Sequence, residues 1–323
     1  MKRSRLFPAL VIALVISILF LNGIMIRESG MNTETVQIHA IIDNSSDNRW
    51  TQFIAGMRQA AEDQDVKLTV MPTGHFLNLE EEKVTIDRSV RDGANGVILQ
   101  LCEDTNVHEM LQILYGQTYV ELVNIGTDET MENITGIVSP DHKAIGEALA
   151  AEALYFAPGP PKDCTIGVVS GEATLSSTKQ CMQRFREVLE EKGIRVSWTL
   201  EQADGFAALR EKLETKKVPD ILVAVDNAGL EAAGEYAASL EKPIVVIGTG
   251  TSTKAIYYLD SGAVKSIVVP EDYTMGYQSV SDLADYIKKN TFTPRIRTVA
   301  YRIIHQDTLF DEDNQGILFP IQR

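Results

Sequence analysis

The sequence predicts an α/β protein with doubly wound parallel sheets, because short apolar runs alternate with helical patterns from Val36 onward. Several of these runs are continuously rich in Val, Ile and Leu, as expected when helices cover both faces of a parallel sheet. Pro and Gly cluster at 157–162, APGPPK, just before another apolar run. With 323 residues, the chain is long enough for two domains. We therefore expect two α/β units, one on each side of this break.

The first expected strand, Val36–Ile42, ends in a polar cluster, Asp43–Asn48. The apolar residues that follow recur at spacings of three and four, which is typical of one helix face: Trp50, Phe53, Ile54, Met57 and Ala61. Asn48 or Asp47 can cap this helix by accepting its free N–H bonds. Ligands of open α/β folds bind where such loops leave the carboxyl ends of strands, so this loop is the first expected ligand site.

The remaining elements follow the same alternation. The expected strands are Val36–Ile42, Val66–Met71, Gly96–Leu101, Tyr119–Ile125, Thr165–Val169, Arg195–Leu200, Ile221–Val225, Ile244–Ile247 and Lys265–Val269. The expected helices lie near Arg49–Asp63, Leu79–Asp92, Val107–Tyr115, His142–Phe156, Thr178–Lys192, Phe206–Thr215, Gly229–Leu240, Thr253–Asp260 and Met275–Lys289. The end of the chain, Gly316–Arg323, carries no recognisable pattern.

The first 30 residues differ from this soluble pattern. Lys2, Arg3 and Arg5 precede a nearly uninterrupted apolar run, Leu6–Ile26. A helix needs about 20 apolar residues to cross a bilayer, and its basic flank stays in the cytoplasm. The run ends without an A-x-A-like cleavage site and has no cysteine for a lipid. We expect one uncleaved transmembrane anchor within 1–30, with the rest outside the cell membrane; a cleaved signal peptide and secretion are the alternative.

Composition and motifs exclude several functions. The chain has 30 basic and 45 acidic residues, a net charge of -15, which argues against nucleic acid as a partner. Cys102, Cys164 and Cys181 are odd in number and widely spaced, so we expect them unpaired and mostly buried. The His residues lack zinc-ligand spacing, and 248–253, GTGTST, fails the dinucleotide-loop pattern. No nucleophile motif is present. We expect no metal, no cofactor and no catalysis.

Five phrases carry a family resemblance. They are SSDNRWTQFIAGMRQAAED (45–63), RDGANGVIL (91–99), VSPDHKAIGEALAAE (138–152), VAVDNAGLEAAG (223–234) and VVPEDYTMGYQSV (268–280). Together they resemble the type I periplasmic binding proteins, in particular the ribose- and galactose-binding group of sugar ABC transporters. The phrases span nearly the whole chain beyond the expected anchor. The lac-repressor family shares this fold, but here a membrane segment stands where its DNA-binding helices would be.

The resemblance implies two α/β lobes that are joined by a hinge and close on a ligand. The N-lobe would comprise 35–137 plus 270–290, and the C-lobe 138–269 plus 298–310. A closing strand near Thr298–Ile304 would return to the C-lobe. Residues 311–323 would form a C-terminal tail.

The resemblance also implies ligand contacts from the N-lobe. Asp47 occupies the position of an Asn that hydrogen-bonds the sugar. Trp50 occupies the position of an aromatic that stacks on the sugar ring, and Arg49 replaces a second aromatic beside it. Gln100 takes the polar position at the end of its strand. Thr127 and Asp128 fall near an Asp-Arg pair of the family.

On the C-lobe, Asp226 matches an Asn or Asp that contacts sugar hydroxyls. Three positions depart from the family pattern. Cys181 replaces an Arg, with Lys179 half a turn away as a substitute, while Gly250 replaces an Asp and Pro270 replaces a Gln. Because a monosaccharide's hydroxyls require these hydrogen bonds, the losses favour a ligand other than an ordinary sugar.

Several of these residues have an equally simple structural role. Trp50 begins the apolar face of its helix, which suits core packing as well as stacking. Asp47 and Asn48 suit a role as helix caps alone as well as a ligand contact. Lys179 suits a solvent-facing charge, and Gln100 is open between the two roles. Asp226 directly follows a buried strand, which favours a functional role.

These observations predict an extracytoplasmic, membrane-tethered solute-binding protein that is not an enzyme. It would bind a sugar or sugar-like small polar ligand between two closing lobes. Its membrane partner would be an ABC permease, for import, or a sensor histidine kinase, for ligand sensing. A repurposed interaction domain without a small ligand is the alternative. A carbohydrate-active enzyme is disfavoured, because no carboxylate pair stands out by position.

Overall fold

The computed structural model describes residues 35–104, 107–126, 132–201, 206–289 and 294–319. By its backbone contacts the chain divides into two compact units, Met1–Val36 and Gln37–Arg323. The first unit lies almost wholly outside the described residues, and so does the anchor expected within 1–30. None of the helices in the described ranges combines the length and the apolar character needed to cross a membrane.

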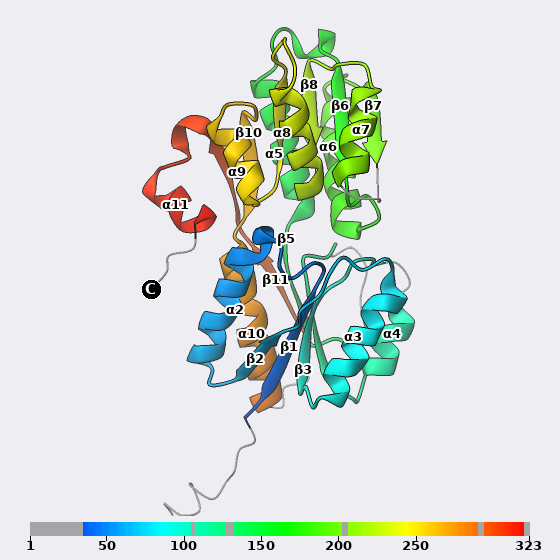
Figure 1. Ribbon diagram of the computed structural model, residues 1–323, viewed down its shortest axis with the longest axis vertical. Helices are drawn as coiled ribbons and strands as arrows, with labels where there is room; N and C mark the ends of the chain where they lie inside the picture. Colours follow the sequence, from blue (N-terminus) through cyan, green and yellow to red (C-terminus); the bar gives the residue numbers. More distant parts are fainter. Residues whose placement is uncertain (1–34, 105–106, 127–131, 202–205, 290–293, 320–323) are drawn as a thin grey trace, which may run out of the picture. The chain divides into compact units, whose positions relative to one another are not determined.

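The second unit contains two six-stranded sheets, each belonging to one lobe (Figure 1). The N-lobe sheet has the strand order β11-β5-β4-β3-β1-β2, and all its paired strands are parallel. Its strands are β1 (Gln37–Ile42), β2 (Lys67–Val70), β3 (Gly96–Gln100), β4 (Tyr119–Val123), β5 (Gly136–Pro140) and β11 (Arg295–Val299). Its helices are η1 (Asn48–Trp50), α2 (Thr51–Asp63), α3 (Leu79–Arg91), α4 (His108–Leu114) and α10 (Asp272–Lys289). Helices α2 and α10 cover one face of the sheet, and α3 and α4 cover the other.

The C-lobe sheet has the order β12-β10-β9-β8-β6-β7, with β12 antiparallel to β10 and the other pairs parallel. Its strands are β6 (Ile166–Ser170), β7 (Trp198–Glu201), β8 (Ile221–Ala224), β9 (Val245–Thr249), β10 (Ser266–Pro270) and β12 (Tyr301–His305). Its helices are α5 (His142–Tyr155), η2 (Pro161–Asp163), α6 (Ser176–Glu191), α7 (Phe206–Glu214), α8 (Asn227–Ala238), α9 (Thr253–Asp260), η3 (Gln306–Thr308) and α11 (Glu312–Leu318). Helices α5 and α6 pack a core on one face, and α7, α8 and α9 pack a core on the other.

The predicted α/β class is confirmed, and three elements correct the expected boundaries. The strand expected near Thr298–Ile304 is two strands, because β11 ends at Val299 in the N-lobe sheet and β12 begins at Tyr301 in the C-lobe sheet. The run contains no Gly or Pro to mark the crossing between them. Strand β5 was not expected, and it extends the N-lobe sheet to Pro140. Helix α11 lies within 311–323, the segment expected as a C-terminal tail.

The chain crosses between the two sheets three times: after β5, after β10 and between β11 and β12. A backbone hydrogen bond of 2.9 Å from Glu271 N to Ala300 O ties the second crossing to the third. Crossing segments of this kind are where a hinge between two lobes absorbs backbone rotation. The three crossings therefore define the hinge.

Two glycines fix α2 against α10. A Cβ on Gly56 would lie 2.0 Å from Tyr273 O, and a Cβ on Gly276 would lie 2.0 Å from Phe53 O. Only glycine permits this backbone approach. The contact holds the start of α2, next to Trp50, in register with the start of α10.

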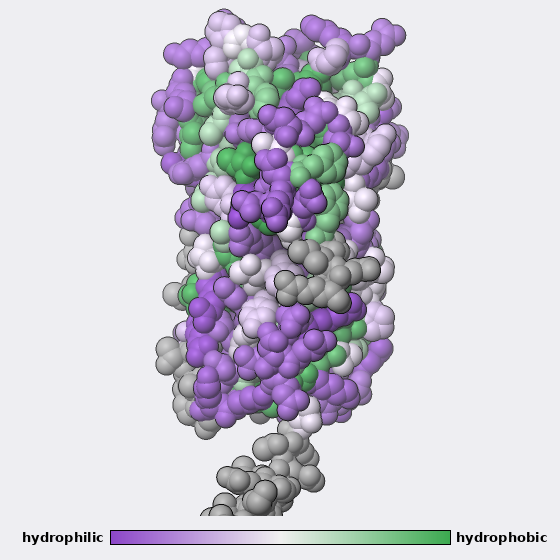
Figure 2. Space-filling model, turned by 90° about the vertical axis from the view of Figure 1, so that its left-hand side faces the viewer, coloured by the Kyte–Doolittle hydropathy of each residue, from purple (hydrophilic) through white to green (hydrophobic). Residues whose placement is uncertain are grey.

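The surface is mainly hydrophilic on the face that Figure 2 presents, where hydrophobic residues form separate small areas. This agrees with a chain that carries 45 acidic and 30 basic residues. The three cysteines are free, as predicted, but only Cys181 is fully buried; Cys102 and Cys164 are partly exposed.

Candidate functional site

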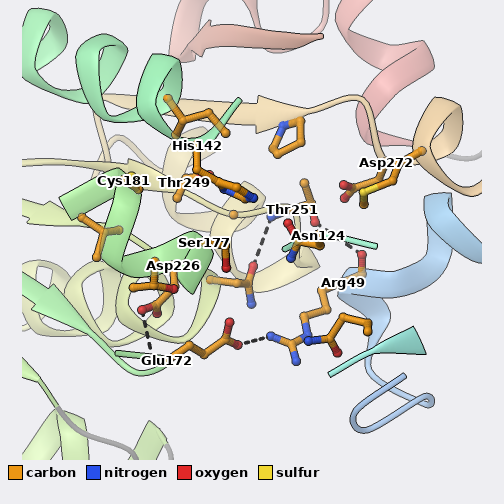
Figure 3. A pocket seen from close by; sticks show the side chains of 18 of the residues that line it. Arg49, Asn124, His142, Glu172, Ser177, Cys181, Asp226, Thr249, Thr251 and Asp272 are labelled. Carbon is orange, nitrogen blue, oxygen red and sulfur yellow. Dashed lines mark hydrogen bonds and ion pairs between the residues drawn. The ribbon is translucent and has the colours of Figure 1, made fainter. Parts of the chain in front are cut away.

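A cleft of about 100 Å³ lies between the carboxyl ends of strands from both sheets. One buried water needs roughly 10–15 Å³ by this measure, so the cleft has room for a small ligand. The N-lobe contributes Arg49, Trp50, Gln100, Asn124, Asp272 and Met275. The C-lobe and its hinge contribute His142, Ile145, Glu172, Ser177, Thr178, Cys181, Val225, Asp226, Asn227, Thr249, Gly250, Thr251 and Pro270. Figure 3 shows most of these side chains around the cleft.

Arg49 is the main charged group that the N-lobe places in the cleft. Its guanidinium makes an ion pair with Glu172 of the C-lobe (Figure 3). Two further carboxylates of the N-lobe surround it, Asp43 at 3.7 Å and Asp47 at 3.9 Å. Burial disfavours the charged form, but the combined attraction of Glu172, Asp47 and Asp43 outweighs it, so the pKa of Arg49 is raised. Arg49 therefore stays charged and joins the two lobes.

Asp47 has a local role. Its side chain accepts a hydrogen bond of 3.0 Å from Arg49 N and so caps the short helix η1. Asp47 is not among the residues that line the cleft. The cap sets the direction in which Arg49 and Trp50 leave the backbone, which makes Asp47 a positioning residue.

Trp50 lines the cleft, but protein groups already engage its ring. The residue is 6% exposed, and its indole Nε1 donates to Asp43 O at 2.9 Å. Phe53 packs against the ring with centroids 5.8 Å apart, and the Arg49 guanidinium lies 4.8 Å from the ring centroid. These contacts are those of a core residue whose edge reaches the cleft.

Asp226 also lines the cleft, yet the protein occupies both its carboxylate oxygens. Ser170 Oγ donates at 2.5 Å, Gly171 N at 2.9 Å, Glu172 N at 3.1 Å and Gly229 N at 2.7 Å. Burial, together with the nearby charge of Glu172, raises the pKa of Asp226. Asp226 therefore caps α8 and holds the loop after β6, which presents Glu172 to the cleft.

Two amide side chains of the lining are engaged in the same way. Gln100 accepts from Asp43 N at 3.2 Å and donates to Leu101 O at 2.8 Å. Asn227 accepts from Thr251 N and Ser252 N, both at 3.1 Å. These residues shape the loops around the cleft and have few hydrogen bonds left for a ligand.

Asp272 begins α10 and places a carboxyl of the N-lobe in the cleft (Figure 3). It is 9% exposed. Burial raises the pKa of Asp272 to about 7, although a hydrogen bond from the Thr251 side chain and the charge of Arg49 act in the opposite direction. This buried carboxyl therefore changes its protonation state near neutral pH.

The helix starts of the C-lobe add neutral polar groups. His142 lies 3.1 Å from Ser139 Oγ through its Nε2, and burial lowers the pKa of His142 to about 4, so the ring is uncharged. Ser177 and Thr178 on α6 are buried and border the cleft. Their hydroxyls can both donate and accept hydrogen bonds.

The structure brings together four of the eight predicted site residues as cleft lining: Arg49, Trp50, Gln100 and Asp226. Lys179 does not reach the cleft. It is exposed on the outer side of α6, because one residue along a helix turns the side chain by about 100° from Thr178. Thr127 and Asp128 lie outside the described residues.

Sequence reasoning missed Glu172 and Asp272. Glu172 follows β6 by two residues, and Asp272 follows β10 by two residues. The rule that ligands bind at the carboxyl ends of parallel strands applies to both positions and could have found them. Metal binding has no support here: in the described ranges, no three His, Cys, Asp or Glu side chains are grouped to hold an ion.

Comparison with known proteins assigns the family. A family model described as periplasmic binding protein domain matches residues 39–291. The chain belongs to this family. Its fold and the cleft between two sheets are those expected from the sequence resemblance.

Solved structures share the fold at low sequence identity. A carbohydrate transporter solute-binding protein from Agrobacterium radiobacter, in complex with D-arabinose, superposes with a TM-score of 0.78 and 18% identity, over 89% of this chain and 100% of that one. GanP, a glucose-galactose binding protein from Geobacillus stearothermophilus, superposes with a TM-score of 0.76 and 18% identity, over 86% of this chain and 100% of that one. A sequence relative, the HTH-type transcriptional repressor PurR of Pasteurella multocida, is 23% identical over 69% of this chain and 66% of its own length. The chain thus spans just under two thirds of that repressor.

Proposed function

We propose that this protein is an extracytoplasmic solute-binding protein that holds a sugar or sugar-like small polar ligand between its two lobes. The observation that carries the proposal is the cleft, which gathers polar side chains from the carboxyl ends of strands in both sheets. Family membership over residues 39–291 supports it. Two structural neighbours are described as a carbohydrate transporter solute-binding protein and a glucose-galactose binding protein.

The protein binds its ligand without transforming it. The lining carboxyls of Glu172 and Asp226 are each engaged by protein donors, which suits holding a closed cleft rather than acid–base chemistry. Closure of the lobes buries the ligand and changes the surface that a membrane partner meets.

Thermal unfolding of the full chain, purified in a mild detergent, tests the proposal. A panel of pentoses, hexoses and related polyols is added in separate samples. A ligand at 100 times its Kd adds about 2.7 kcal/mol to the free energy of unfolding, which gives a measurable rise in Tm. The proposal expects at least one such rise. No rise with any compound would contradict it and favour an interaction domain.

We further propose that the segment within 1–30 tethers the protein to the membrane, with an ABC permease or a sensor histidine kinase as its partner. The apolar run Leu6–Ile26 and its basic flank support the tether. The mass of the mature protein tests it, since cleavage would remove this segment. Neighbouring genes for a permease and an ATPase support import, whereas genes for a kinase and a response regulator support sensing.

A further inference from the structure

The polar lining of the cleft carries an excess of negative charge. Of the lining residues within the described ranges, Arg49 alone has a permanent positive charge. Three carboxyl side chains line the cleft with it: Glu172, Asp226 and Asp272. His142 adds no compensating charge, because burial lowers the pKa of its ring to about 4.

Arg49 is not available to balance a further carboxylate. Its guanidinium makes the ion pair with Glu172 and has Asp43 and Asp47 within 4 Å. The side chain is only 13% exposed. The single cation of the described lining is therefore already matched by more than one carboxylate.

Asp226 is compensated within the C-lobe. Three backbone N–H groups and one hydroxyl donate to its two oxygens, and the start of α8 adds a favourable helix dipole. Protein donors therefore occupy both of its oxygens, which leaves Asp226 little hydrogen-bonding capacity for a ligand.

Asp272 is different. It forms no close ion pair with any described residue: the Thr251 side chain gives its carboxyl a hydrogen bond, and the charge of Arg49 acts on it from a greater distance. Burial raises its pKa to about 7, because the hydrogen bond from Thr251 and the charge of Arg49 offset the desolvation only in part. A buried carboxylate of this kind is costly unless a cation or several donors face it.

We infer that the natural ligand carries a positively charged amino group, as an amino sugar or an aminated polyol does, and that this group binds the Asp272 carboxylate. An ammonium supplies one positive charge and three hydrogen-bond donors. The hydroxyls of Thr251 and Ser177 also line the cleft, and they can accept hydrogen bonds from ligand donors that Asp272 does not engage. This inference rests on the proposed function and narrows its ligand class.

A matched set of sugars tests the inference. Calorimetric titration of the full chain in mild detergent compares glucosamine with glucose and N-acetylglucosamine, and galactosamine with galactose and N-acetylgalactosamine. Each trio differs at C2 in the charge and donors of one group. We expect at least one amino sugar to bind tenfold or more tightly than both of its neutral counterparts.

Two variants test whether Asp272 causes the preference for amino sugars. Asp272→Asn removes the charge but keeps the shape, and should bring the amino sugar's affinity down to that of the neutral sugar. Asp141→Asn is the control, because Asp141 caps α5 and does not line the cleft; it should leave the preference unchanged. Neutral sugars that bind as tightly as the amino sugars would overturn the inference and leave the proposed function standing. No binding by either class here, and no rise in Tm in the wider panel, would overturn both.

Discussion

Arg49 of the N-lobe and Glu172 of the C-lobe form an ion pair across the cleft, with side chains 13% and 27% exposed. A second contact joins the lobes: the Asp104 carboxylate of the N-lobe accepts hydrogen bonds from Ser176 N, at 2.8 Å, and from Ser176 Oγ. Asp104 thereby caps α6 of the opposite lobe. The protein's own groups thus join the two lobes directly, so a ligand supplies only part of the free energy of closure.

The Arg49–Glu172 pair should bias the lobes toward closure. In Glu172→Gln, Arg49 keeps Asp43 and Asp47 nearby. The free energy that favours closure should therefore fall by about 1 kcal/mol, as for an exposed ion pair, and not by the larger amount typical of a buried one. We expect a larger radius of gyration for the free protein by small-angle X-ray scattering, and ligand affinity weaker by roughly fivefold. Glu147→Gln, which breaks a pair with Arg184 inside the C-lobe, is the control. Equal radii for both variants would show that the pair does not hold the lobes.

Asp226 should matter for stability even without ligand. Asp226→Ala removes a helix cap, worth about 1 kcal/mol, and leaves the buried donors at Ser170 and Gly171 without their acceptor, at about 1–3 kcal/mol each. The matched control is Asp141→Ala, which removes an N-cap whose carboxylate accepts a hydrogen bond from Ala144 N. Urea unfolding should show a loss for Asp226→Ala at least about 2 kcal/mol greater than for the control. Equal losses would mean that the Asp226 hydrogen bonds contribute little.

Trp50 should behave as a core residue. Trp50→Ala deletes a ring that is 6% exposed and packs on Phe53, so we expect a loss of about 3–5 kcal/mol in the free energy of unfolding. Trp50→Phe retains an aromatic ring and loses the bond to Asp43 O, at about 0.5–1.5 kcal/mol plus a small cavity cost. Urea unfolding of both variants measures the two losses, and that of Trp50→Ala should be the larger. A Trp50→Ala variant of unchanged stability that no longer binds ligand would instead establish a stacking role.

Asp272 should make stability fall as the pH rises toward 7. Its folded pKa, about 7, lies above the unfolded value, so the native state binds more protons between about pH 4 and 7. The stabilisation is therefore present at low pH and is lost as pH rises through 7. His142 acts in the opposite sense, because its folded pKa of about 4 is below the unfolded value.

Asp272→Asn isolates the contribution of this carboxyl. The variant cannot ionise at this position, so it should be more stable than the wild type at pH 8, and the difference should shrink toward pH 5. Urea unfolding at pH 5, 6, 7 and 8 measures it. A variant less stable than the wild type at pH 8 would show that the carboxylate is well compensated in the protein.

Periodicity was enough to predict most of the fold. The apolar spacing after Asn48 predicted α2, and the Val-rich run 221–225 predicted β8, because each pattern reflects burial of a whole face. The boundary at Ala300 could not be predicted in this way. Strands β11 and β12 are joined by one residue, and only pairing with different sheets separates them.

The site was less predictable, because it depends on which partner each polar group finds. Asp226 directly follows a strand, as a ligand contact would, but its oxygens are taken by the loop after β6. Glu172 joins the two lobes because it pairs with Arg49, which lies 123 positions away in the sequence. Position relative to a strand end could be predicted from the sequence, whereas the remaining hydrogen-bonding capacity could not.

The central claim is that a small polar ligand binds in the cleft, and a variant that fills the cleft tests it most directly. Thr249 ends β9 and lines the cleft, whereas Lys179 is exposed on the outer side of α6. The rise in Tm that a ligand from the panel produces should disappear in Thr249→Trp and persist in Lys179→Trp. A rise that persists in Thr249→Trp would place the ligand elsewhere and contradict the account.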